Sequence, residues 1–319
     1  MYCSGFAQDL DNMLKTLHNG GLKMMGIEYF LSDFDCFCKE NFAYDSILTM
    51  EIAEKWIQNT ASESKAHMWR RVNAMRHLGR YQLSLGKEAY ITSHTIRRPR
   101  AEEPRLFSDE QLVEFFEKVD TQTKPTKTFP YNDVVFPVML RLIYCCGLRS
   151  SEACNLKVED IDFTLGALDI YRSKNLRDRR VFMSDDILGL CQRFHYYYSG
   201  IIPDRMYFFQ PSQTRECYIS AEVTIVFDKL LKRTSFCNTA GKKFTEHGLR
   251  HLFAVQNIRK CAECGEDFSN WVQYLSRYMG HKNIQFTKHY LHITSQSFPV
   301  YSEKLNLLGE GIGVLHVED

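Results

Sequence analysis

The feature that most constrains this chain lies near its carboxyl end. A segment rich in aromatic and apolar residues stops at Gly280 and is followed at once by His281. Glycine is the usual residue just past a helix end because it tolerates a left-handed backbone. We therefore predict that His281 is held on a turn, with its imidazole fixed in direction. Helical spacing after Asn283 brings Tyr290 back towards the same pocket, so we expect a histidine and a phenol to share a site.

A tyrosine phenol with a pKa of about 10 is a poor nucleophile at neutral pH. It becomes reactive where nearby bases and cations favour the phenolate and stabilise the charge of the group under attack. The chain supplies such residues in several distant segments. The candidate site residues are Arg149, Lys174, His247, Arg250, His281 and the nucleophile Tyr290.

These residue types fit attack on a phosphodiester, which builds negative charge on the non-bridging oxygens. Arg149 and Arg250 offer two guanidiniums that bind such oxygens in bidentate fashion. Lys174, carried on a hairpin, offers a proton to the leaving sugar oxygen. One histidine accepts the phenol proton and another hydrogen-bonds the phosphate. Because cations take the place of a metal ion, this set requires neither metal nor cofactor.

Each candidate alone has an ordinary structural explanation. Arg149 is typical of a surface ion pair, His247 of a helix cap, and His281 of a histidine that interacts with a helix dipole. Tyr290 is one of 17 tyrosines and is typical of a packed aromatic. Only their joint occurrence in this order favours an active site.

The first part of the chain predicts a small helical domain. Apolar residues recur at helical spacing over residues 22–40, a helix start is indicated at Thr49, and a third helix is expected over about 62–85. Residues 65–100 hold nine Lys or Arg and one acid, although the net charge of the chain is only +1. This local excess favours a nucleic-acid surface. The candidate DNA-binding residues are Arg70, Arg71, Arg76, Arg97, Arg98 and Arg100.

The remainder predicts a mainly α domain with a small β-hairpin. A long apolar helix is expected over about 131–146, and strands near 168–170 and 180–183 place Lys174 near the hairpin tip. A capping box of Ser108 with Gln111 opens this second domain. The predicted organisation is a helical DNA-binding domain at 1–92, a basic linker at 93–106, a catalytic domain at 107–301 and a tail at 302–319 that either exchanges between protomers or frays.

The composition indicates the cellular compartment in which the chain is expected. No apolar run reaches the roughly 18 residues of a membrane span, and no signal peptide is evident at the amino end. The 11 scattered cysteines favour reduced thiols in a cytoplasmic protein. Cys261 and Cys264 form a single pair without two further matched ligands, so we do not predict zinc. Trp271, Tyr274 and Tyr278 are spaced like a core stripe.

The candidate residues lie in motifs that resemble those of the tyrosine recombinases, the phage integrase family. The matching stretches are Gly147-Leu-Arg-Ser-Ser-Glu-Ala153, His247-Gly-Leu-Arg-His251, and Met279-Gly-His281 with Tyr290 nine residues further on. They are similar, in chain order, to the first arginine box, the His-x-x-Arg box, and the third box with its nucleophile. Met279 stands where the family usually has leucine, a swap that conserves volume. The resemblance covers about 107–301, and the basic helical first part is similar to the core-binding domain.

The resemblance implies a fold, a mechanism and partners. The two domains would clamp DNA, and Tyr290 would form a 3′-phosphotyrosine link that a 5′-hydroxyl reseals. Two such rounds would pass through a Holliday junction, held by a homotetramer bound to an inverted-repeat core site. Accessory DNA-bending proteins are compatible with this assembly as further partners. Arg149 and Arg250 would hold the phosphate, with Glu152 bracing the first box, and His247 would act in proton transfer near Tyr290.

The resemblance also implies further roles, of which the general acid and the biological task stay open. His281 would bind the phosphate and Lys174 would be the general acid, with Arg172 and Arg177 as its alternatives. The implied location is the cytoplasm, on nucleoid DNA. The implied task is either recombination of a mobile element or resolution of chromosome dimers. Two other functions remain: a tyrosine-type relaxing topoisomerase and a catalytically inactive DNA-binding regulator.

Overall fold

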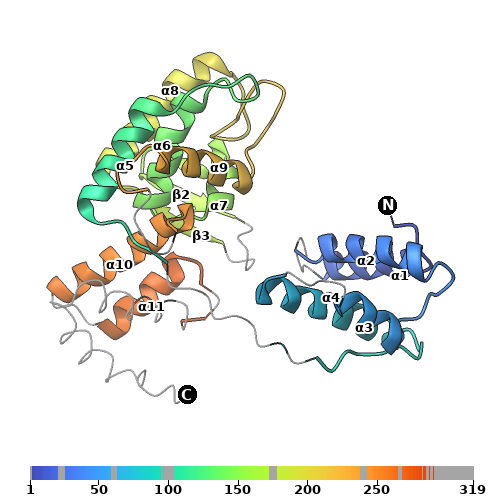
Figure 1. Ribbon diagram of the computed structural model, residues 1–319. Helices are drawn as coiled ribbons and strands as arrows, with labels where there is room; N and C mark the ends of the chain where they lie inside the picture. The colour runs from blue at the N-terminus through green and yellow to red at the C-terminus, as the bar shows by residue number, and fades with distance from the viewer. Residues whose placement is uncertain are drawn as a thin grey trace. The chain divides into compact units, whose positions relative to one another are not determined.

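The computed structural model (Figure 1) describes most of the 319-residue chain. The described residues are 2–20, 26–58, 63–94, 96, 104–171, 178–237, 243–264, 268–281, 283, 284, 287 and 290. The chain divides into two compact units, residues 1–102 and residues 103–319. This division falls inside the segment 93–106 that the sequence predicts as a linker. Within the described residues, no helix is both long and apolar enough to span a membrane.

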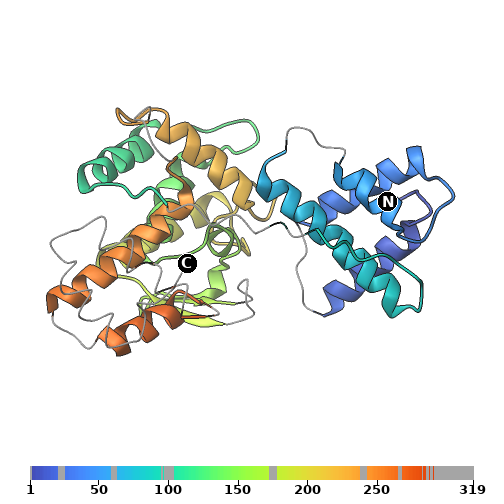
Figure 2. The same cartoon turned by 60° about the horizontal axis from the view of Figure 1, so that its bottom comes forward.

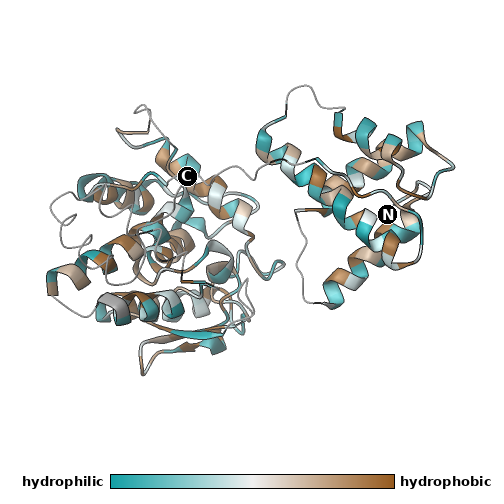
Figure 3. Ribbon diagram, turned by 90° about the horizontal axis from the view of Figure 1, so that it is seen from below, coloured by the Kyte–Doolittle hydropathy of each residue, from teal (hydrophilic) through white to brown (hydrophobic). Residues whose placement is uncertain are grey.

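The first unit is built from helices. They are α1 (Ala7–Asn19), α2 (Glu28–Asn41), α3 (Met50–Gln58) and α4 (Lys65–Ser84). Figure 3 shows hydrophobic and hydrophilic residues alternating along them, which is the pattern of helices with one buried face. Those faces meet around Phe6, Phe34 and Trp56, whose rings pack edge to face.

The three helix predictions for this unit are confirmed, one of them with a later start. The Thr49 hydroxyl accepts a hydrogen bond from the Ile52 amide at 3.3 Å and opens α3, and α4 lies within the predicted range 62–85. The predicted first helix at 22–40 instead begins at Glu28. Helix α1, which precedes it, was not predicted, although its buried Phe6, Leu10 and Met13 recur at helical spacing.

The second unit is mainly helical with a small sheet. Its helices are α5 (Asp109–Gln122), α6 (Asn132–Cys145), α7 (Ser150–Cys154), the 3₁₀ turn η1 (Val158–Asp160), α8 (Asp185–Ile201), α9 (Ser220–Leu231), α10 (Glu246–Cys264) and α11 (Phe268–Tyr278). The predicted capping box is confirmed, because Ser108 Oγ accepts from the Gln111 amide and the Gln111 side chain accepts from the Ser108 amide.

The sheet is antiparallel with the order β1-β2-β3. Its strands are β1 (Ile161–Asp162), β2 (Ala167–Ile170) and β3 (Arg179–Phe182). Leu168 pairs with Val181, and both side chains are buried. The predicted hairpin is therefore confirmed, with β3 one residue earlier than expected, while the two-residue β1 was not predicted.

Two hydrophobic clusters position the site. The larger surrounds α6, whose Phe136, Met139 and Leu142 are fully buried. The smaller joins α10 and α11, which lie side by side in Figure 2, and includes Tyr290. Helix α11 also contacts β3. The end of α11 thus lies between the hairpin and α10, where the predicted site residues converge.

Candidate active site

A turn at Gly147 presents the first arginine. Gly147 has φ +62°, and a Cβ there would lie 2.5 Å from the Phe253 ring of α10, so a larger residue would force the two segments apart. Arg149 follows as the residue that caps α7. Its backbone amide donates to Glu152 Oε2 at 2.9 Å, and its Nη1 donates to Glu152 Oε1 at 2.6 Å. Glu152 therefore braces this box from both sides.

The end of α11 confirms the predicted helix stop. Gly280 has φ +63°, its amide donates to the Arg277 carbonyl at 2.9 Å, and the His281 amide donates to the Ser276 carbonyl at 3.0 Å. This pair of bonds is the Schellman motif, which requires a left-handed residue at the position of Gly280. The backbone of His281 is thereby fixed.

The last carbonyls of α11 each accept a hydrogen bond from a different arginine. Arg179 Nε donates to the Tyr278 carbonyl at 2.7 Å, Arg250 Nη2 donates to Met279, and Arg149 Nη2 donates to Gly280 at 3.1 Å. Carbonyls at a helix C-terminus lack helical partners and carry partial negative charge. The end of α11 therefore gathers three guanidiniums that come from distant parts of the chain.

Arg250 is the most deeply buried of the three, with 1% of its surface exposed. Its Nη1 donates to the Gly147 carbonyl, so it joins the turn before α7 to the end of α11. Burial and the neighbouring Arg149 lower the pKa of Arg250 to about 10, which leaves the group charged at neutral pH. Two of its five N–H groups donate to these carbonyls, and the others are suited to an anion.

Glu152 is the carboxylate at the centre of the arginines. Arg179 Nη1 and Nη2 donate to its two oxygens at 2.9 Å and 2.7 Å. Burial by itself raises the pKa of Glu152, but the hydrogen bonds and charge of Arg179, with Arg250 and Arg149, lower it to about 2. Three guanidiniums therefore face one carboxylate, and the net positive charge suits a phosphate diester.

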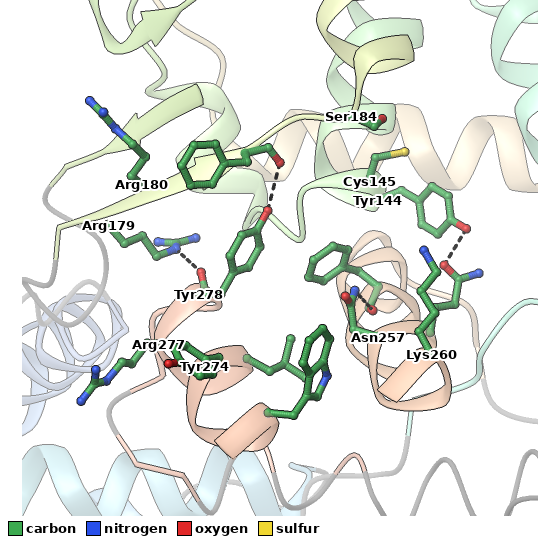
Figure 4. Close-up of a pocket in the computed structure, with 15 residues that line it drawn as sticks. Tyr144, Cys145, Arg179, Arg180, Ser184, Asn257, Lys260, Tyr274, Arg277 and Tyr278 are labelled. Carbon is green, nitrogen blue, oxygen red and sulfur yellow. Dashed lines mark hydrogen bonds between the residues drawn. The ribbon is translucent and has the colours of Figure 1, made fainter. Parts of the chain in front are cut away.

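Arg179 was missed as a site residue. It begins β3, its side chain is 7% exposed, and a Cβ on Gly280 would lie 3.1 Å from its Nη1. Figure 4 shows Arg179 reaching the Tyr278 carbonyl. The sequence carried only a weak signal, since Arg179 is one of several arginines around the hairpin.

The two histidines nearest the nucleophile differ in their contacts. His281 Nδ1 lies 2.8 Å from Thr287 Oγ1, and burial together with the three arginines lowers the pKa of His281 to about 3. His281 is therefore a neutral hydrogen-bonding group at neutral pH. His251 Nδ1 lies 2.9 Å from the Tyr290 hydroxyl. His251 ends the second box in the sequence, but nothing in the sequence indicates its contact with Tyr290.

Tyr290 lies inside the site. It is 3% exposed and packs in the cluster of α10 and α11, and its ring stacks 6.0 Å from the His281 ring. Burial raises the pKa of the Tyr290 phenol, while Arg250 and Arg149 act in the opposite direction. Both guanidiniums thus interact electrostatically with the phenol, as the predicted chemistry requires.

The structure brings together most of the predicted site residues. Arg149, Arg250, His281 and Tyr290 converge at the end of α11, and the exposed His247 lies one turn before His251 with ring centroids 4.5 Å apart. His247 also lies near enough to His281 to influence its charge. Lys174 and its alternatives lie outside the described residues.

The predicted DNA-binding arginines have different environments. Arg70 is exposed on α4. The prediction for Arg71 is wrong, because its side chain is only 9% exposed and is bound by Asp33 at 2.9 Å and by Glu63. A guanidinium held this way inside its own domain is not available to a phosphate. Arg76 is half-buried and donates to the Thr92 and His94 carbonyls. The other three, Arg97, Arg98 and Arg100, lie outside the described residues.

Two other sequence interpretations can be compared with the structure. Cys261 is buried and Cys264 exposed, both on α10, and over the described ranges no group of three His, Cys, Asp or Glu residues could hold a metal ion. The interpretation of the aromatic stripe on α11 is wrong for Tyr274, which is 69% exposed and lines a cavity with Trp271 and Tyr278.

Known proteins share this sequence pattern. The sequence profile of the phage integrase family matches residues 107–297. The tyrosine recombinase XerA of Pyrococcus furiosus is 27% identical over 210 residues, which cover 66% of this chain and 65% of XerA. A tyrosine recombinase of Pseudothermotoga lettingae is 32% identical over 161 residues, 50% of each protein. The chain thus matches about half to two thirds of the length of these relatives.

The fold has solved counterparts as well. A lambda integrase tetramer bound to a Holliday junction has a TM-score of 0.62 with 17% sequence identity, and the alignment covers 89% of this chain and 76% of that one. A likeness at this identity establishes the architecture. The profile match over residues 107–297, in the second or catalytic unit, assigns the chain: this protein belongs to the phage integrase family, the tyrosine recombinases.

Proposed function

We propose that this protein is a site-specific DNA recombinase that cleaves and rejoins DNA through a 3′-phosphotyrosine intermediate. The observation that carries the proposal is the burial of the Tyr290 phenol beside the guanidiniums of Arg149 and Arg250. A buried phenol that only packs against a core gains nothing from two neighbouring cations. Cations at this place stabilise the charge that develops on an attacked phosphate.

The residues then take defined roles. Arg149 and Arg250 bind the non-bridging oxygens, and neutral His281 donates a further hydrogen bond to them. Lys174 protonates the leaving 5′-oxygen. The histidines of α10 take part in proton transfer at Tyr290. Arg179 and Glu152 do not touch the phosphate and instead orient the first arginine.

The partners follow from this chemistry. The substrate is double-stranded DNA with an inverted-repeat core site, bound by two domains that clamp it, and strand exchange proceeds through a Holliday junction in a homotetramer. Arg70, Arg97, Arg98 and Arg100 contribute phosphate contacts, and accessory DNA-bending proteins assist assembly. The place of action is the cytoplasm, on nucleoid DNA.

We also infer that residues 302–319 pass to a neighbouring protomer. A cavity of about 740 Å³ lies between β3, α10 and α11, with Phe253, Trp271 and Leu275 on its wall and Arg180 and Arg277 among its cations (Figure 4). The tail carries two groups of apolar residues, at 305–308 and 312–317, with acids at Glu303, Glu310, Glu318 and Asp319, which suit an apolar wall with cations beside it. Deletion of 302–319 should weaken tetramer assembly on DNA while a single protomer still binds a half-site, as measured by analytical ultracentrifugation.

Covalent capture tests the recombinase proposal. Nicked duplexes with randomised inverted repeats are incubated with the protein, and the DNA that becomes attached is sequenced to obtain the core site. Wild type should then form an adduct on this site that Tyr290→Phe does not form, and the adduct should form in the presence of a chelator. DNA binding without any adduct would support the inactive regulator, and relaxation of plasmids without recombinant product would support the topoisomerase.

A further inference from the structure

The Tyr290 hydroxyl has a specific neighbour that the matched motifs do not assign. His251 Nδ1 lies 2.9 Å from the phenol oxygen, with ring centroids 5.3 Å apart. His251 is half-buried on α10, one residue after Arg250 and one turn after His247. Since His247 and His251 are four residues apart, both lie on the face of α10 that points to the site. The structure thus gives the second histidine of this pair a hydrogen-bond contact with the nucleophile.

The phenol needs such a neighbour. Tyr290 is 3% exposed, so bulk water has little access to its proton. Burial raises the pKa of the phenol more than Arg250 and Arg149 lower it, so the hydroxyl is protonated at neutral pH. Attack on phosphorus requires that this proton leave as the new bond forms. A group within hydrogen-bond reach must therefore accept it.

We propose that His251 is the general base that accepts the Tyr290 proton during DNA cleavage. This inference rests on the recombinase function proposed above. The Tyr290 oxygen forms a bond to phosphorus while the bond from phosphorus to the 5′-oxygen breaks. The phenol proton moves to His251 Nδ1, and the leaving oxygen takes its proton from the general acid. In rejoining, His251 returns the proton to Tyr290 as the 5′-hydroxyl attacks.

The surroundings of His251 fit this role. His251 directly follows Arg250 on α10, and His247 packs edge to face against its ring. The Tyr290 ring packs against it and also stacks with the His281 ring, and Glu152 is a carboxylate of the same site, 3.8 Å from Arg250 Nη1. As negative charge builds on the phosphate, the imidazolium becomes favourable, so proton transfer and bond formation assist each other.

Paired asparagine variants test the proposal. His251→Asn keeps a hydrogen-bonding atom near the place of Nδ1 but cannot accept a proton at neutral pH. His247→Asn is the matched control one turn away. Cleavage of the nicked core-site duplex is measured in single turnover from pH 6 to 9, with tyrosine or a fluorinated tyrosine of lower phenol pKa at position 290.

We expect His251→Asn to bind DNA like wild type and to cleave on the order of 100-fold more slowly. Its rate should rise with pH, and the fluorinated tyrosine should restore it more fully than it restores His247→Asn. A His251→Asn rate within about threefold of wild type would overturn the proposal, as would a defect that the fluorinated tyrosine does not relieve. Wild type serves as the reference: without a wild-type adduct, the recombinase function fails instead.

Discussion

Replacement of Glu152 by glutamine should remove a large contribution to the stability of the catalytic unit. The carboxylate is 4% exposed and accepts four hydrogen bonds from Arg149 and Arg179. Its pKa of about 2, against an ordinary value of 4.5, corresponds to about 3 kcal/mol. Removal of one partner from a buried ion pair costs a similar amount, about 3–5 kcal/mol, because the other charge stays buried. We therefore expect Glu152→Gln to lose about 3 kcal/mol at pH 7.

The pH dependence of the free energy of unfolding gives a second and independent measure of the contribution of Glu152. A carboxylate whose folded-state pKa is lowered stabilises the protein above its unfolded-state pKa, and this stabilisation disappears as pH falls through the folded-state pKa. The difference between wild type and Glu152→Gln should therefore be constant from pH 7 to about pH 5. Below about pH 4.5 it should shrink, because only wild type then takes up a proton on unfolding.

The assay must report on the catalytic unit alone. Hydrogen exchange of α6 and α10 peptides in increasing denaturant, read by mass spectrometry on the full chain, gives its free energy of unfolding. Asp169→Asn is the control, because Asp169 forms the same bidentate pair with Arg180 at 2.7 and 2.8 Å but on the exposed face of the hairpin. It should cost less than about 1 kcal/mol. A Glu152→Gln loss no larger than this control, or one that does not change between pH 7 and 3, would refute the reasoning.

Three shorter predictions concern neighbouring residues. Arg70→Gln should lower the slope of DNA affinity against salt concentration by about one phosphate contact, and an unchanged slope would contradict this assignment. Arg71→Gln should instead destabilise the first unit by about 3 kcal/mol, because it removes a partner of Asp33 and Glu63. Gly280→Ala should cost about 1–2 kcal/mol from its left-handed backbone and slow cleavage by displacing Arg179, measured by unfolding and single-turnover rates. Proton NMR should find His281 neutral from pH 5 to 8, and a titration midpoint above 5 would contradict its burial among arginines.

Local chemistry explains which parts of the site the sequence could predict. The stop at Gly280 and the direction of the His281 backbone depend on residues within one helical turn, so the glycine alone was informative. Helix α1 depends on equally local signals, because Phe6 and Leu10 recur at helical spacing on its buried face. The two residues of β1 are too few for any periodic pattern, so that strand could not be predicted.

The parts that the sequence could not predict depend on long-range pairing. Glu152 and Arg179 are 27 residues apart, and nothing in either segment indicates the bidentate contact between them. For Arg71, the sequence predicted a contact with DNA, but the structure shows a contact within the protein. Its position in a basic window suggested DNA contact, but the window does not reveal that Asp33, 38 residues earlier, folds back onto it. Charge in a sequence window describes a surface only when the residues stay on that surface.

The arrangement at the end of α11 also bears on how catalysis is prepared. A helix normally leaves its last carbonyls to water or to a cap. Here the carbonyls of Tyr278, Met279 and Gly280 are bound by three arginines, two of which, Arg149 and Arg250, hold the phosphate in the proposed reaction. Because these guanidiniums are fixed before DNA arrives, little reorganisation is needed when negative charge develops on the phosphate. Folding of the catalytic unit and preparation of its active site are thus the same event, and a change that frays α11 should reduce stability and cleavage together.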